Sequence, residues 1–118
     1  MGSILVIDDD SAILKVMDIM LTKHGYDVKV AHDGIEGIEL LNNDPRIELV
    51  ITDIRMPGKD GNQVAKFIRS DEKIKNTPII AMTAYPQDAE KELFDSILLK
   101  PFEYKELIEL TDSLLVTF

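Results

Sequence analysis

The chain contains no cysteine among its 118 residues. This absence excludes a disulfide framework, a thiolate metal site and a cysteine nucleophile. Long hydrophobic runs are missing too, and the first apolar stretch, residues 4–7, has no basic region before it. The sequence therefore predicts neither a membrane span nor a signal peptide, and we expect a cytoplasmic protein with no membrane partner.

Positive charge is scarce. The sequence has 13 basic against 22 acidic residues, for a net charge of -9. Because such a surface repels phosphate backbones, we expect no direct nucleic-acid partner. Internal repeats, low-complexity tracts and Pro/Gly-rich linkers are also lacking, and the length suits one hydrophobic core. We expect a single domain covering residues 1–118.

Strand and helix patterns alternate along the chain. Short apolar runs predict strands at residues 4–7, 28–31, 49–52, 79–82 and 97–99. Apolar residues at helical spacing predict helices at 11–24, 34–43, 63–71, 86–94 and 103–116, of which the fourth has only a weak apolar stripe. Five alternations indicate an α/β fold with a parallel sheet and helices on both faces. The common strand order 2-1-3-4-5 places its switch point between the first and third strands.

Residues capable of chemistry follow four of the five predicted strands. Asp8 and Asp9 follow the first strand, Asp53 the third, Thr83 the fourth and Lys100 the fifth. The carboxyl ends of parallel strands form one edge of the sheet, and ligands bind at that edge. Each residue alone is more typical of a helix cap, a turn or a solvated surface. Their joint placement favours a functional site.

The three carboxylates define the chemistry of this site. Clustered carboxylates repel one another, so the cluster should take up a proton or bind a cation. Oxygen ligands of this kind suit Mg²⁺. An aspartate beside such an ion can accept a phosphoryl group and form an acyl phosphate, while Lys100 and Thr83 would stabilise the phosphoryl oxygens. The residues predict phosphoryl transfer to a carboxylate.

Four motifs in this order resemble the signature of the response-regulator receiver domain of two-component signalling. They are Ile-Leu-Val-Ile-Asp-Asp-Asp at 4–10, Ile-Thr-Asp-Ile-Arg-Met-Pro-Gly-Lys-Asp-Gly at 51–61, Met-Thr-Ala at 82–84 and Leu-Lys-Pro-Phe at 99–102. The resemblance covers nearly the whole chain. It implies a CheY-like, flavodoxin-like doubly wound (βα)5 fold with a five-stranded parallel sheet in the order 2-1-3-4-5.

The resemblance also assigns the acidic residues. It implies that Asp53 is the phosphoacceptor and receives its phosphoryl group from a histidine kinase or a phosphotransfer protein. Asp9 and Asp53 would bind Mg²⁺ directly, together with the backbone carbonyl of Arg55. Asp8 would act mainly through a metal-bound water. We therefore expect Mg²⁺ as the cofactor.

The remaining matched residues would sense the phosphoryl group. Thr83 would bond a phosphoryl oxygen in the active state, and Lys100 would pair with the phosphate. The Lys100–Pro101 peptide bond is cis in similar proteins. The implied function is a phosphorylation-switched module of a phosphorelay, a monomer when unphosphorylated, that presents a changed surface to an unknown downstream protein. It would not be an enzyme, although it takes part in its own phosphoryl transfer and autodephosphorylation.

Two departures from the family pattern stand out. Ile97 occupies a position that is usually aromatic and that swings inward when the threonine moves, so we expect the aromatic half of the switch to be absent. The segment between Thr83 and Lys100 is about one helical turn short, which predicts a truncated or irregular fourth helix. A further hypothesis is slow autodephosphorylation, because Arg55 and Tyr85 are bulky and would flank the path of the attacking water.

Three other functions stay open at this point. A pseudoreceiver would bind a partner without phosphorylation, and Ile97 with the short fourth helix is compatible with it. A Mg²⁺-dependent aspartyl-phosphate hydrolase of the haloacid-dehalogenase kind would carry an aspartate where this chain has Arg55. A flavin carrier on the same fold is disfavoured, because Asp8, Asp9 and Asp10 would repel a cofactor phosphate.

Overall fold

The computed structural model describes residues 2–115 and contains one five-stranded parallel sheet. Its strands are β1 (Ser3–Ile7), β2 (Asp27–Ala31), β3 (Ile47–Thr52), β4 (Ile79–Thr83) and β5 (Ser96–Leu99). They lie in the order β2-β1-β3-β4-β5. The predicted flavodoxin-like fold class and strand order are confirmed.

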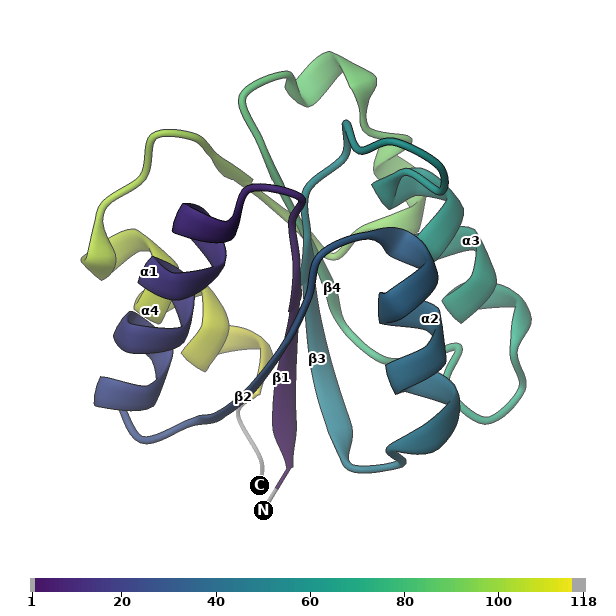
Figure 1. Ribbon diagram of the computed structural model, residues 1–118, viewed down its shortest axis with the longest axis horizontal. Helices are drawn as coiled ribbons and strands as arrows, with labels where there is room; N and C mark the ends of the chain where they lie inside the picture. Colours follow the sequence, from purple (N-terminus) through teal and green to yellow (C-terminus); the bar gives the residue numbers. More distant parts are fainter. Residues whose placement is uncertain (1, 116–118) are drawn as a thin grey trace.

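Helices cover both faces of the sheet. They are α1 (Ser11–Lys23), α2 (Gly34–Asn43), α3 (Gly61–Ser70) and α4 (Tyr104–Leu114). Figure 1 shows α1 and α4 on one face and α2 and α3 on the other. The predicted C-terminal helix reached Val116, which lies outside the described residues. None of the helices between residues 2 and 115 is long and apolar enough to cross a membrane.

Two apolar cores flank the sheet, because the central strands are buried on both faces. Every residue of β1 and β4 is buried. The core beneath α1 and α4 includes Leu14, Met17, Leu21, Leu107 and Ile108. The core beneath α2 and α3 includes Leu41, Val64, Ala65 and Ile68. Packing on both sides fixes the strands and, with them, the residues that follow each strand.

Local capping fixes where the first and third helices begin. The Asp10 side chain accepts hydrogen bonds from the first turn of α1. Helix α3 begins at Gly61, two residues before the predicted start, because Asp60 and Gln63 form a capping box. A Cβ atom at Gly61 would collide with the backbone carbonyl of Asp53. Glycine therefore lets α3 start directly against the loop that follows β3.

The predicted helix over residues 86–94 is wrong as a single element. The β4–β5 segment (residues 84–95) instead contains two separate 3₁₀ turns, Pro86–Asp88 and Lys91–Leu93. Between them the backbone is extended, and the Asn62 side chain bonds both the Asp88 carbonyl and the Glu90 N–H. In a continuous helix this carbonyl and this N–H would instead form hydrogen bonds within the helix. The expectation of a truncated or irregular fourth helix is confirmed.

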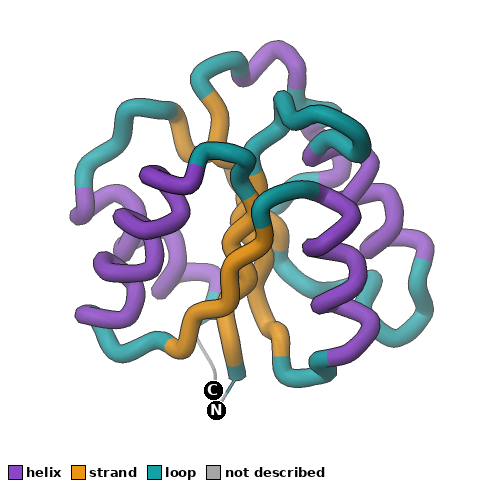
Figure 2. Tube along the Cα trace, viewed as in Figure 1, coloured by secondary structure: helices purple, strands orange, loops and turns teal. Residues whose placement is uncertain are grey.

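The loops that follow the strands gather at one edge of the sheet. Figure 2 shows the loops after β1, β3 and β4 at the top of the view, where the strands end. The Lys100–Pro101 bond in the loop after β5 is cis, as the resemblance implied. The edge predicted to carry the site is thus formed by these loops.

Candidate functional site

Backbone hydrogen bonds fix the positions of the strand-end residues relative to one another. The Asp8 N–H donates to the Ala31 carbonyl at 3.1 Å, and the Asp53 N–H donates to the Ile7 carbonyl at 2.9 Å. The Lys100 N–H donates to the Thr83 carbonyl at 3.0 Å. Each bond ties the start of a loop to a neighbouring strand. The backbone of Asp8, Asp53 and Lys100 is therefore held to the sheet although these residues belong to loops.

Three carboxylates meet at this edge. Asp8, Asp9 and Asp53 each present an oxygen, and the three oxygens lie within 4.8 Å of one another. Asp8 is buried, Asp53 is half-buried and Asp9 is exposed. The cluster predicted from the strand ends is therefore present. It opens to solvent on the side of Asp9.

Lys100 joins two of these carboxylates. Its Nζ donates to Asp8 Oδ2 at 2.9 Å and to Asp53 Oδ2 at 3.2 Å. The other oxygens have backbone donors, since Asp8 Oδ1 accepts from the Asp10 N–H and Asp53 Oδ1 from the Ile54 N–H. One ammonium thus offsets part of the charge of two carboxylates. An oxygen of Asp53 that is paired only with Lys100 remains next to the solvent-facing Asp9.

The electrostatics of this cluster oppose the ionisation of Asp8 and favour the charged form of Lys100. Burial raises the pKa of the Asp8 carboxyl above its usual value, and the negative charge of Asp53 acts in the same direction. Burial tends to lower the pKa of Lys100, but its bonds and attraction to Asp8 and Asp53 outweigh this, so the pKa is raised. The ammonium is therefore held charged by its acidic neighbours.

The donor set fits a hard divalent cation. Carboxylate oxygens are the ligands that Mg²⁺ prefers, and it commonly uses one or two of them with waters and phosphate oxygens. Asp9 is exposed, and Asp53, whose side chain is 13% exposed, lies next to it. A cation between them would relieve a repulsion that Lys100 offsets only in part. The backbone carbonyl of Arg55 belongs to the same loop as Asp53, and its predicted ligand role stays a prediction.

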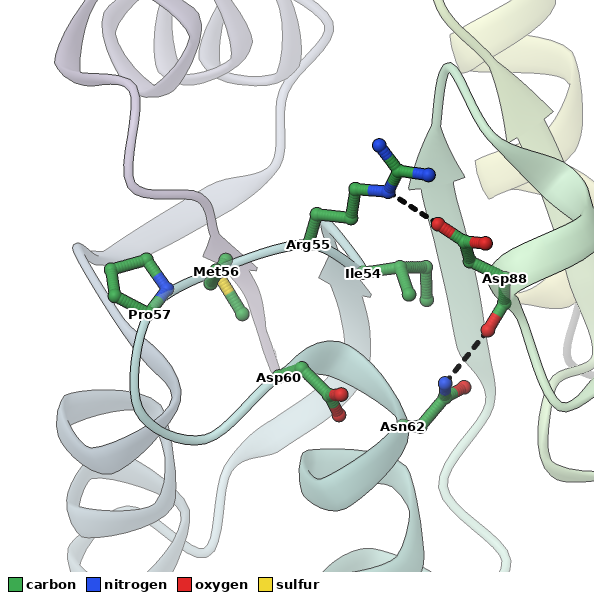
Figure 3. Close-up of a pocket in the computed structure, with 7 residues that line it drawn as sticks. All are labelled: Ile54, Arg55, Met56, Pro57, Asp60, Asn62 and Asp88. Atoms are coloured by element: carbon green, nitrogen blue, oxygen red, sulfur yellow. Dashed lines mark hydrogen bonds and ion pairs between the residues drawn. The ribbon is translucent and has the colours of Figure 1, made fainter.

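Thr83 and Arg55 already have partners of their own. The Thr83 hydroxyl is buried and accepts a hydrogen bond from the Tyr85 N–H at 2.9 Å. The Arg55 guanidinium lies over the Tyr85 ring, with Cζ 3.6 Å from the ring centroid, and forms an ion pair with Asp88. The Asp88 partner raises the pKa of Arg55. Figure 3 shows Arg55 extending from its loop toward Asp88 across a shallow hollow.

Comparison with known proteins decides the family. The model of the response regulator receiver domain matches residues 4–112. The chain belongs to this family. Receiver domains are signalling phosphoacceptors of two-component systems, and they interact with histidine kinases or phosphotransfer proteins and with downstream targets. They bind Mg²⁺ at an acidic pocket, which agrees with the aspartate cluster of this receiver domain.

Solved receiver domains have the same architecture. The response regulator TrrA from Thermotoga maritima, in complex with Mg²⁺ and beryllofluoride, is 36% identical, with a TM-score of 0.88 and coverage of 98% of this chain and 100% of that one. The chemotaxis protein CheY4 of Vibrio cholerae is 28% identical, with a TM-score of 0.89 and coverage of 98% and 99%. A receiver domain of a histidine kinase from Syntrophus aciditrophicus is 25% identical, with a TM-score of 0.88 and coverage of 98% and 90%. The receiver domain of a histidine kinase thus shares this fold with a response regulator and a chemotaxis protein.

Two contributors to the site could not be predicted from the motifs. Asn62 is nearly buried beside the pocket and bonds the β4–β5 segment, and Asp88 pairs with Arg55. Both residues lie in segments whose sequence is typical of an ordinary helix start and turn. The sequence has no signal that identifies either residue, because the burial of Asn62 and the pairing of Asp88 with Arg55 arise from tertiary contacts.

Proposed function

We propose that this receiver domain, spanning residues 1–118, accepts a phosphoryl group on Asp53 from a histidine kinase or a phosphotransfer protein. The observation that carries the proposal is the meeting of Asp8, Asp9 and Asp53 with the Lys100 ammonium at one sheet edge. Of the two shielded carboxylates, Asp8 has a side chain that is 1% exposed, whereas that of Asp53 is 13% exposed and lies beside the exposed Asp9. A carboxylate in that position is accessible to an incoming phosphoryl group.

The transfer forms one bond and breaks another. An oxygen of Asp53 attacks the phosphorus of a donor phosphohistidine, so a P–O bond forms as the P–N bond breaks. The leaving imidazole takes up a proton, and Asp53 becomes an acyl phosphate. Mg²⁺, held by Asp9, Asp53 and the Arg55 carbonyl, with Asp8 acting through a water, would neutralise charge on the phosphoryl oxygens during transfer. Without that cation the acidic cluster repels the donor.

Lys100 and Thr83 would change partners after transfer. The Lys100 ammonium lies 3.2 Å from Asp53 Oδ2, so it can move onto a phosphoryl oxygen bonded there while it keeps Asp8. Charge-assisted bonds of this kind are stronger than neutral ones. The Thr83 hydroxyl can donate its proton to another phosphoryl oxygen. The movement of Thr83 would release the Tyr85 N–H, which now donates to its hydroxyl, and so alter a binding surface on the β4–β5 segment.

Fluorine NMR with beryllofluoride tests the proposal directly. We expect wild-type protein with Mg²⁺ and beryllofluoride to give a bound fluorine signal, because the reagent mimics a phosphoryl group on a carboxylate. Asp53→Asn should give none, whereas Asp10→Asn, which keeps the α1 cap but changes the neighbouring charge, should still bind. A wild-type protein that forms no adduct would leave the pseudoreceiver as the better account.

A further inference from the structure

The β4–β5 segment is fastened to α3 rather than folded as a helix. Asn62, Lys66 and Arg69 lie on one stripe of α3, at the i, i+4, i+7 spacing. Lys66 pairs with Glu90 at 3.1 Å, and Arg69 bonds the Leu93 carbonyl and Asp95. Asn62 bonds the backbone on either side of Ala89. The far half of the segment, residues 90–95, is thus held by two charged side chains of α3.

The near half, residues 84–89, has a different fastening. Its main charged contact is the ion pair between Asp88 and Arg55, and Arg55 follows Asp53 by two residues. Figure 3 shows the Nε atom of Arg55 directed at the Asp88 carboxylate. Both terminal nitrogens of this guanidinium make no hydrogen bond to any residue between 2 and 115. Four N–H donors of Arg55 are therefore open to another acceptor.

A second link connects this half to the other side of the site. The Tyr85 N–H donates to Thr83 Oγ1, and the Tyr85 ring supports the Arg55 guanidinium. Thr83, Tyr85, Arg55 and Asp88 thus form a continuous chain of contacts. The chain does not pass through Ile97, which packs instead with Ile54, Ala81 and Ala89 in a small apolar cluster.

We propose that Asp88 is a positioning residue that holds Arg55 away from Asp53, and that a phosphoryl group on Asp53 displaces it and releases residues 84–89. The inference rests on the proposed function of Asp53. The Asp88–Arg55 pair then acts as a latch, closed in the unphosphorylated protein and open in the phosphorylated one. The latch takes the place of the aromatic switch that Ile97 cannot provide.

Charge and geometry favour this exchange of partners. A phosphoryl group has a charge of about -1.5 to -2 at pH 7 and three acceptor oxygens, whereas Asp88 has a single negative charge. The planar guanidinium binds such an oxyanion with two parallel bonds. The pair with Asp88 is easy to break, since more than half of the Arg55 side chain is exposed, and exposed pairs contribute little stability. Rotation of Thr83 toward the same phosphoryl group would release the Tyr85 N–H at the same time.

Amide hydrogen exchange measures the latch without reference to activity. The amides to follow are those of Asp88 and Ala89, which donate to the carbonyls of Tyr85 and Pro86. We expect their exchange to become roughly two- to fivefold faster when Mg²⁺ and beryllofluoride are added to the wild type, the range that loss of one exposed ion pair allows. In Asp88→Asn they should exchange at the faster rate from the start, with no further change. Asp88→Glu should restore the response.

Lys66→Gln is the matched control, because it removes another ion pair to the same segment without touching Arg55. It should loosen the segment in both states yet keep the beryllofluoride-dependent change. A bound fluorine signal without faster exchange in the wild type would overturn the latch and leave the phosphoacceptor function standing. The same response in Asp88→Asn as in wild type would also overturn it. Absence of any adduct would overturn the proposed function and the latch with it.

Discussion

The Lys100 ammonium lies 2.9 Å from the buried Asp8 carboxylate and so joins the loop after β5 to the end of β1. Removing Lys100 leaves two shielded carboxylates without their cation. We expect Lys100→Met to lower the free energy of unfolding by about 2 kcal/mol in metal-free buffer, as measured by urea denaturation. Lys105→Met, which removes an exposed pair with Glu109, should change it little.

Magnesium should reduce the loss of unfolding free energy caused by Lys100→Met, because a bound cation neutralises part of the charge of the Asp8 and Asp53 carboxylates. The same urea titration with Mg²⁺ added checks this. Equal losses with and without Mg²⁺ would show that the ammonium and the cation do not share the same carboxylates.

Asp9 should decide whether Mg²⁺ stabilises the fold. At tenfold excess over its dissociation constant, a bound ion adds about 1.4 kcal/mol, which corresponds to roughly 5 °C in melting temperature for a domain of this size. We expect this shift in the wild type and in Asp10→Asn, but not in Asp9→Asn. Since Asp10 caps α1 and lies outside the cluster, a loss of the shift in Asp10→Asn would argue against the proposed ligand set.

Tyr26 should govern stability at alkaline pH. Burial, together with the hydrogen bond from its hydroxyl to Asp112, raises its pKa to about 12. The pKa of tyrosine in the unfolded chain is about 10. The contribution of Tyr26 to the free energy of unfolding is therefore complete below pH 10 and is lost as the pH rises through about 12. The free energy of unfolding of the wild type should therefore fall across this window. Tyr26→Phe should show a smaller fall, and identical pH profiles would contradict the assignment.

Arg55 and Tyr85 should set the lifetime of the acyl phosphate. Once the guanidinium has moved from Asp88 to the phosphoryl group, it and the Tyr85 ring on which it now stacks would shield that group from an attacking water. We expect phosphate loss to be faster in Arg55→Ala and in Tyr85→Ala than in wild type, timed after phosphorylation with acetyl phosphate. Unchanged rates in both variants would dismiss this role.

Most of the fold and of the acidic site followed from the sequence for a physical reason. Apolar runs that alternate with helices indicate a parallel sheet, in which the carboxyl ends of the strands share one edge. Asp8, Asp53 and Lys100 directly follow β1, β3 and β5. Each motif is contiguous in the sequence, and its chemistry depends on the residue types it contains. Such motifs can be recognised without knowledge of tertiary contacts.

The β4–β5 segment could not be predicted in the same way. Its weak apolar stripe is compatible with a short helix, but the segment takes its conformation from α3 side chains 24 to 28 residues earlier, chiefly Asn62 and Arg69. The Asp88–Arg55 pair likewise joins residues that are distant in sequence. Long-range polar contacts produce no periodic pattern in the sequence. The shortened segment could therefore be predicted, but the two 3₁₀ turns that it forms could not.

The most direct test of the central claim is to locate the phosphoryl group. Protein treated with Mg²⁺ and acetyl phosphate is reduced with borohydride, which converts an aspartyl phosphate to homoserine, and peptides are mapped by mass spectrometry. Our account predicts homoserine at position 53 alone and none in Asp53→Asn. Homoserine at position 8 or 9, or none in the wild type, would contradict it.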